Sequence, residues 1–379
     1  MSHNRRHDAA SDESYKPARS PTYELDLAAN MELLNILEPL NQALALNHVT
    51  STRSTVAKRQ SEAQHEQSGD FKKIGAGACG IIFAQRGKSM VIKLAKNSDS
   101  NELWNDFLQH KLIAESFSFY DPTAIKLPKC YGFIPKDRSE FWDINQSLSR
   151  IAEPLCHLPT HGLCTERILP LPEVTRQLLI DKYLRVYLGS LRGRSGGMFF
   201  SLRNFKLHLN QLVDLRLDVT TMALSMGSAL AIMHWAAQTD ARDVEFVLGS
   251  ITEPLPTMSA AEAAALLPNS WTGPPSDNLE DFHHRKTALW LLDFNQVRHI
   301  TMDEDGLALA VEAFKLNDPY YPKPLQDDTV AKDLWNTFAK SYLEMSQIIL
   351  RSKGSHDIQQ LPGQFLKAVI NMQRQKKNT

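Results

Sequence analysis

Three stretches of the chain combine residue types and spacings that suit the binding of a nucleotide. The first is the glycine-rich run GAGACG at positions 75–80, which is followed by an ammonium group at Lys93. Glycine has no side chain, so a loop of this kind lets backbone N–H groups approach phosphate oxygens closely. A lysine on a following strand brings a positive charge to the same phosphates. We therefore expect Gly75, Gly77, Gly80 and Lys93 to contact a nucleotide.

The residues that follow the glycines distinguish two kinds of nucleotide loop. In a dinucleotide-binding fold the glycines open a helix, whereas here the strand-forming run Ile81-Ile82-Phe83 comes next. A strand–loop–strand context is what a kinase-type nucleotide flap requires. An ordinary hairpin turn is the simpler alternative, and the lysine that follows favours the flap.

The second and third stretches supply carboxylates. Asp240 is followed five positions later by Glu245 and then by the apolar residues 246–248, a spacing that fits a catalytic loop. In this interpretation Asp240 accepts the proton of a hydroxyl group and Glu245 holds a metal ion. An alternative alignment makes Asp243 the base. Asp293 ends an apolar run, and a carboxylate in that position suits the chelation of Mg²⁺ between phosphates.

The first half of the chain contains elements able to position the flap and the lysine. Residues 71–94 carry two runs of β-branched and aromatic residues around a turn, which predicts an antiparallel hairpin. Apolar residues at three- and four-residue steps predict a helix over 101–119. Shorter apolar runs predict strands at 131–134 and 163–168.

Two prolines mark a boundary between the halves of the chain. Pro170 and Pro172 end the strand pattern, and the sequence beyond them is mainly of helical type, including a long apolar helix at 220–237. We also expect a helix at 173–185 and a hairpin-like segment at 199–217. The proline-flanked, alanine-rich stretch 251–285 predicts a surface insertion with one short helix.

The two ends of the chain are polar. Residues 1–69 read as a disordered tail and linker that hold one amphipathic helix, over 25–46, with apolar residues at helical steps despite Pro39. Residues 353–379 read as a polar C-terminal tail.

Composition excludes several classes of function. The chain has 379 residues, with 42 Lys and Arg against 43 Asp and Glu, so its net charge of −1 makes nucleic-acid binding an unfavoured function. Four cysteines are too few for a disulfide scaffold, and the N-terminus has no apolar signal region, so we expect an intracellular protein, cytoplasmic or nuclear. No run approaches the roughly 18 apolar residues of a membrane span, so no membrane partner is expected.

These features resemble the protein-kinase-like superfamily, including its aminoglycoside-phosphotransferase-like branch, over roughly residues 70–350. Four stretches also resemble a filamentous-fungal family of uncharacterised function, some of whose members are labelled zinc-finger proteins. They are CTERILP at 164–170, MHW at 233–235, DVEFVLG at 243–249 and WLLDFN at 290–295.

The resemblance implies a two-lobed fold with ATP in the cleft between the lobes. It implies the following roles: the glycines cover the phosphates, Lys93 contacts them, the backbone from Glu166 to Ile168 forms the hinge against adenine, Asp240 is the base, and Asp293 binds the metal.

The chain departs from the superfamily pattern at several places. Gln238 stands where the superfamily has a histidine, Glu245 where it has a metal-binding asparagine, and Asn295 where it has a glycine. The helix glutamate that should pair with the lysine is either Glu102 or Glu115.

A further group of zinc-type ligands lies at Cys156, His157, His161 and Cys164. The ligands follow one another without the long loop that separates the two pairs of a zinc finger. Buried cysteines and surface histidines are therefore the expected explanation.

We thus expect an α+β, bilobal protein-kinase-like fold, with a small β-rich N-lobe over 70–168 and a larger helical C-lobe over 169–352. The expected function is binding of ATP and Mg²⁺, with phosphoryl transfer to the hydroxyl group of an unknown protein or small molecule. The alternative is a catalytically degenerate pseudokinase that serves as a protein-interaction module.

Overall fold

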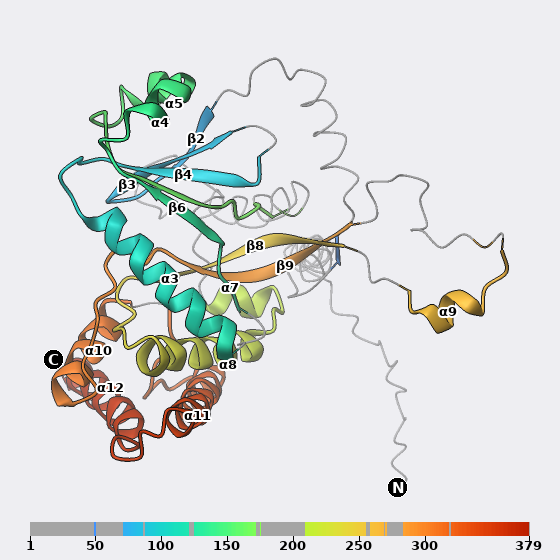
Figure 1. The fold of residues 1–379 in the computed structure, drawn as a ribbon. Coiled ribbons are helices and arrows are strands. Elements are labelled where there is room, and N and C mark those ends of the chain that lie inside the picture. The colour runs from blue at the N-terminus through green and yellow to red at the C-terminus, as the bar shows by residue number, and fades with distance from the viewer. Residues whose placement is uncertain are drawn as a thin grey trace, which may run out of the picture.

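The computed structural model describes residues 49–50, 71–85, 88–120, 125–171, 175, 209–254, 258–268, 270, 283–317 and 320–378. Helices and strands both contribute to the core, so the fold belongs to the expected α+β class (Figure 1). The predicted helix at 173–185, the N-terminal tail with its helix at 25–46, and most of the linker lie outside the described residues.

A five-stranded antiparallel sheet carries the glycine run and Lys93. Its order is β2-β3-β4-β7-β6, and the strands are β2 (Phe71–Ala76), β3 (Gly80–Gln85), β4 (Met90–Ala95), β6 (Cys130–Ile134) and β7 (Gly162–Glu166). The hairpin predicted over 71–94 and the two later strands are therefore confirmed. The helix expected at 101–119 is α3 (Glu102–Tyr120), which follows β4 in the chain.

Helices cover both faces of this sheet because its strands alternate their side chains between the faces. On one face, Phe83 and Leu94 pack with Leu148 of α5 (Gln146–Ala152), beside the short helix α4 (Ser139–Ile144). On the other face, Leu163 packs with Leu103 of α3. The lysine side chain of β4 therefore emerges beside α3.

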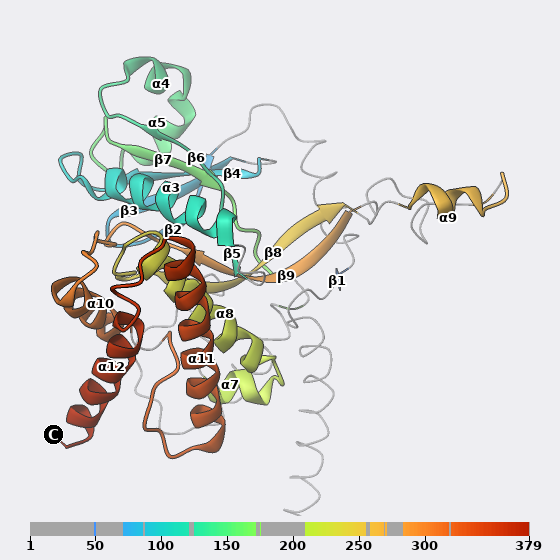
Figure 2. The ribbon, with the colours of Figure 1, turned by 60° about the horizontal axis from the view of Figure 1, so that its bottom comes forward.

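A second sheet is built on a long hairpin. β8 (Glu245–Pro254) pairs antiparallel with β9 (His283–Leu292) along its whole length, and the short strands β1 (Val49–Thr50) and β5 (Ile125–Lys126) also pair with β9. Figure 2 shows this hairpin reaching away from the helices. The pairing extends the strands into the segment expected to be an insertion, which shortens it to residues 255–282. It holds the short helix α9 (Ala260–Ala264), whose N-terminus is closed by a capping box.

The largest apolar core lies among the helices of the second half. They are α7 (Leu209–Asp214), α8 (Val219–Ala231) with its π-helical continuation Ile232–Ala236, α10 (Glu304–Leu316), α11 (Thr329–Ser352) and α12 (Leu361–Asn378). Gly227 lets α8 approach α11 closely, because a Cβ there would lie 2.4 Å from the carbonyl oxygen of Phe338.

The stretch Val219–Ala236 is long and apolar enough to pass a length-and-composition test for a membrane span. Since 61% of this window is buried inside the protein, its apolar character is explained by packing in the core.

Two segments differ from expectation. Residues 353–379 are not a polar tail, because helix α12 buries Leu361, Phe365 and Val369 in the core while its polar residues face outward. Where the structure describes the segment 199–217, it forms helix α7 and not a hairpin. In both cases packing against the rest of the core selects the helix, as it does for most helices in proteins.

Candidate functional site

Lys93 on β4 joins two carboxylates from distant parts of the chain. Its Nζ atom lies 2.9 Å from Oδ2 of Asp106 on α3 and 2.8 Å from Oδ1 of Asp293, which directly follows β9. The Lys93 side chain is only 13% exposed. Burial disfavours its charged form, but the two carboxylates outweigh burial and hold the pKa of Lys93 above its ordinary value. A fixed cation therefore stands where β4, α3 and the end of β9 meet.

The acidic partner of Lys93 on α3 is Asp106, and the expectation of Glu102 or Glu115 was wrong. Asp106 lies on the buried face of α3, whereas both glutamates are exposed. Oδ1 of Asp106 also accepts the backbone N–H of Phe294 at 3.3 Å. One carboxylate thus holds the lysine and the residue after Asp293 together.

Further contacts from α3 fix the segment that follows β9. Nδ2 of Asn105 donates to the carbonyl oxygens of Asn295 and Val297, each at 2.9 Å. The ring of His110 lies on that of Phe294, with a centroid separation of 5.0 Å. Any shift of α3 would therefore move the carboxylate of Asp293.

The glycine run forms the turn between β2 and β3, where the N–H of Gly77 donates to the carbonyl of Gly80 at 2.9 Å. A Cβ at Gly80 would lie 2.9 Å from the carbonyl oxygen of Leu94 and 3.0 Å from Cγ of Lys93. Gly80 therefore packs directly on the lysine stem and has no room for a side chain. Gly75 and Gly77 have room, because a Cβ there would make no contact shorter than ordinary with any described atom.

We expect Gly80→Ala to lower the free energy of unfolding by about 1–3 kcal/mol, because the added methyl must displace backbone atoms of β4. Gly77→Ala is the matched control and should change that free energy by less than about 0.5 kcal/mol. Urea unfolding of the two variants measures the difference. Equal free energies of unfolding for the Gly80→Ala and Gly77→Ala proteins would show that Gly80 is not closely packed against Lys93.

Asp240 is buried, and its carboxylate is fully engaged in holding the chain together. Oδ1 accepts the backbone N–H of Arg242 at 3.0 Å and that of Arg298 at 2.9 Å, and Oδ2 accepts Nε of Arg298 at 2.6 Å. None of its side chain is exposed. This placement speaks against the role of base assigned to Asp240 and favours the alternative, Asp243.

Asp243 is exposed and lies close to Asp293. Its backbone N–H donates to Oδ1 of Asn317 at 2.6 Å, and its carboxylate accepts Nε2 of Gln296. Partial burial and the charge of Asp293 raise the pKa of Asp243 above its ordinary value. Asp243 and Asp293 both have left-handed backbones, with φ of 59° and 67°, and such strain often accompanies functional sites.

The side chain of Tyr320 is influenced by the charges of three carboxylates. Burial, together with the charges of Glu245, Asp243 and Asp293, raises the pKa of Tyr320 to about 12. Carboxylate oxygens are the ligands that Mg²⁺ prefers. Within the described part of the chain, no group of three or more His, Cys, Asp and Glu side chains is arranged to hold a metal ion by itself.

The proposed hinge connects the two sheets. The N–H of Glu166 donates to the carbonyl of Lys129 at 2.7 Å, and Oε2 of Glu166 accepts the N–H of Lys129 at 3.0 Å. Ile168 packs against Gly249 on β8, where a Cβ would lie 2.5 Å from its Cγ2. Glu166 is thus engaged within its own sheet, and the contact of this backbone with adenine stays a prediction.

The residues of the cysteine–histidine group have separate partners. Sγ of Cys156 donates to the carbonyl of Ala152 at 3.3 Å, and Nδ1 of His161 accepts the N–H of Lys136 at 3.2 Å. Cys164 lies within β7, where burial raises the pKa of its thiol to about 11. Cys156 and His161 therefore already have hydrogen-bond partners within the protein.

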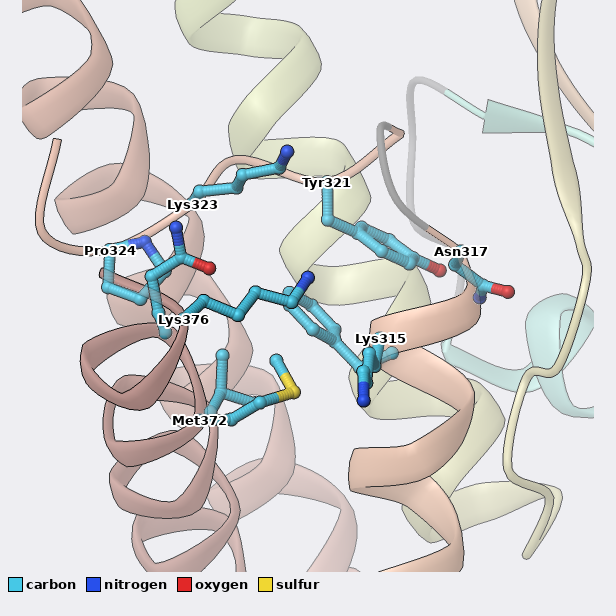
Figure 3. A pocket seen from close by; sticks show the side chains of 10 residues that line it. Lys315, Asn317, Tyr321, Lys323, Pro324, Met372 and Lys376 are labelled. Carbon is cyan, nitrogen blue, oxygen red and sulfur yellow. The ribbon is translucent and has the colours of Figure 1, made fainter. Parts of the chain in front are cut away.

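A small pocket lies between α10 and α12. Figure 3 shows Lys315, Tyr321, Lys323 and Lys376 around it. Its volume of about 10 Å³ has room for roughly one water molecule, so it does not hold a nucleotide.

One family model, described as zinc finger protein, matches residues 289–354. No curated protein and no solved structure matches the chain. The matched segment covers β9 from Leu289, Asp293 and the helices α10 and α11. It contains no cysteine and only one histidine, His299, so it lacks the ligands of a zinc finger.

Proposed function

We propose that this protein binds ATP with Mg²⁺ in a kinase-like cleft and transfers a phosphoryl group to a hydroxyl acceptor. The observation that carries the proposal is the position of Lys93. Its ammonium group lies within 2.9 Å of one carboxylate on α3 and of another directly after β9, beneath the glycine turn. Gly80, at the end of this turn, packs on the lysine stem, so the turn lies next to the side chain of Lys93.

The order of the elements supports a bilobal kinase-like fold. The glycine turn joins β2 and β3, the lysine lies on β4, and α3 comes between β4 and the edge strand β6. This is the strand–loop–strand–lysine–helix succession of the superfamily that the sequence resembles. The small lobe would comprise residues 70–168 and the large lobe 169–352.

Bound Mg²⁺ and ATP would supply the transferable phosphoryl group and part of the charge neutralisation. The chain would position them: the glycine turn and Lys93 hold phosphate oxygens, and Asp293 and Glu245 hold the metal. Kinases act mainly by positioning the phosphates and stabilising their charge. The residues named here would supply both effects.

Asp243 is the residue that we assign as the base. It is exposed, so an acceptor hydroxyl can reach it, and its raised pKa makes it a stronger proton acceptor than an ordinary aspartate. Asp240 would instead hold the loop through Arg298.

The test is release of the γ-phosphate from Mg-ATP, with water as the acceptor, by the wild type and by Asp243→Asn. We expect the variant to be slower by about 10²–10⁴-fold while it binds ATP as before. The wild-type rate should fall as the pH drops through the raised pKa of Asp243, because the protonated carboxyl no longer accepts a proton. An Asp243→Asn rate equal to that of the wild type would contradict the assignment.

One observation favours the alternative, a pseudokinase that binds nucleotide without transfer. Glu245 stands where the superfamily that the sequence resembles has a neutral asparagine, so the proposed site would hold a third carboxylate, with those of Asp243 and Asp293, beside the triphosphate. In that case the wild type binds Mg-ATP and releases no γ-phosphate, and Glu245→Asn tightens Mg-ATP binding.

A further inference from the structure

The outer face of α3 carries a row of large apolar side chains. Trp104, Leu108, Leu112 and Phe119 are between 41% and 76% exposed. Their spacing of four, four and seven residues places them along one side of the helix, opposite the buried side that holds Asp106. We call these four residues the α3 stripe.

A groove adjoins the stripe. Its volume is about 310 Å³, and it lies between the second half of α3 and the segment from Ile125 to Cys130. Its rim is basic, with Lys111, Lys126 and Lys129. The stripe and groove together form an apolar surface with a positive edge, which is the form expected of a binding site for an amphipathic helix.

The segment 25–46 of this chain matches that surface in pattern and charge. It repeats apolar residues at helical spacing, and it contains Asp26, Glu32 and Glu38 but no lysine or arginine. As a helix it would be about 33 Å long, close to the about 28 Å of the 19-residue α3.

The strand β1, which follows this segment in the chain, lies close to the strand that follows α3. β8 occupies one edge of β9, so β1 and β5 share the other edge. Val49 pairs with Lys286 in antiparallel register, so the N-terminal end of β1 points toward Leu289, where β5 pairs. The distance from Lys286 to Leu289 along the strand is about 10 Å. β5 is the next strand after α3 in the chain, so the edge of β9 that β1 joins also receives the chain that leaves the Phe119 end of the stripe.

We propose that residues 25–46 form a helix that packs along the α3 stripe, with its acidic residues beside the basic rim of the groove. The helix runs parallel to α3, with its C-terminal part near Phe119 and its N-terminal part near Trp104. Because α3 carries Asp106, this contact covers the helix that holds Lys93. The proposal stands apart from the nucleotide chemistry and does not depend on it.

Two readouts on the full chain test this contact. The first is amide hydrogen exchange of residues 25–46, which should be slow in the wild type and about tenfold or more faster in Leu112→Asp. The control is Ile348→Asp on α11, where the side chain is 55% exposed, and it should leave the exchange unchanged. The second is oxidative footprinting of Trp104, which should increase several-fold in Leu34→Asp. That variant alters only the segment, so it leaves the core of the described fold intact.

Three results would overturn the proposal. The first is rapid exchange of residues 25–46 in the wild type, and the second is oxidation of Trp104 that does not change in Leu34→Asp. The third is protection that disappears on dilution together with a dimeric mass, which would assign the stripe to a second copy of the chain.

Discussion

Replacing Asp240 with alanine is expected to lower the free energy of unfolding by about 2–4 kcal/mol. The carboxylate accepts three hydrogen bonds, from the backbone of Arg242 and from the backbone and side chain of Arg298, and each bond to a charged group contributes about 1.5–3 kcal/mol without being additive. The guanidinium that remains is 37% exposed and regains water, so the loss stays below that of a fully buried ion pair. Urea unfolding measures the effect.

Asp243→Ala is the matched control for Asp240→Ala. Asp243 is exposed, so its replacement should change the stability by less than about 1 kcal/mol while it removes phosphoryl transfer. In the proposed function, Asp240 therefore stabilises the fold and Asp243 accepts the proton. The opposite pattern, a stable Asp240→Ala protein without transfer and an active Asp243→Ala protein, would return the role of base to Asp240.

Replacing Lys93 with methionine is expected to abolish nucleotide binding and to destabilise the unliganded protein. Methionine keeps most of the apolar stem but leaves Asp106 and Asp293 without their shared cation, and breaking such a buried pair costs about 3–5 kcal/mol. Lys72→Ala, on an exposed position of β2 in the same sheet, is the control and should change neither property.

A second change separates the two effects of Lys93→Met. Asp106→Asn removes one of the stranded negative charges and keeps the shape of the side chain, so the double variant should regain part of the lost stability. It should still fail to bind ATP, because the phosphate oxygens have lost their cation. Recovery of nucleotide binding in the double variant would show that Lys93 has only a structural role.

The sequence predicts those parts of the site whose residues have local signals. The glycine run, the strands beside it and the carboxylate after an apolar strand are all visible within short windows, and the structure places Lys93 against Asp293 as their order along the chain suggests. Asp106 was missed because a glutamate was expected. Its position in phase with the buried residues Leu103 and His110 is a signal that was available.

The choice between Asp240 and Asp243 had no local signal. Asp240 is held by Arg298, which is 58 residues away in the sequence, and Asp243 is held by Asn317, which is 74 residues away. Such contacts form only when the hairpin and α10 are in place, so the spacing within the loop leaves both aspartates open. Helix α12 was missed for a related reason, since a few apolar residues in a polar stretch become core only against α10 and α11.

The central claim is that Lys93 and Asp293 form a nucleotide site, and a calorimetric titration of the full chain with Mg-ATP tests it most directly. We expect the wild type and the Lys72→Ala protein to bind Mg-ATP saturably, with one site per chain. We expect no measurable heat for the Lys93→Met/Asp106→Asn protein, which has the net charge of the wild type and whose folding is checked by urea unfolding. Binding of equal affinity to all three proteins would place the nucleotide elsewhere. Absence of binding to the wild type at millimolar Mg-ATP would contradict the account.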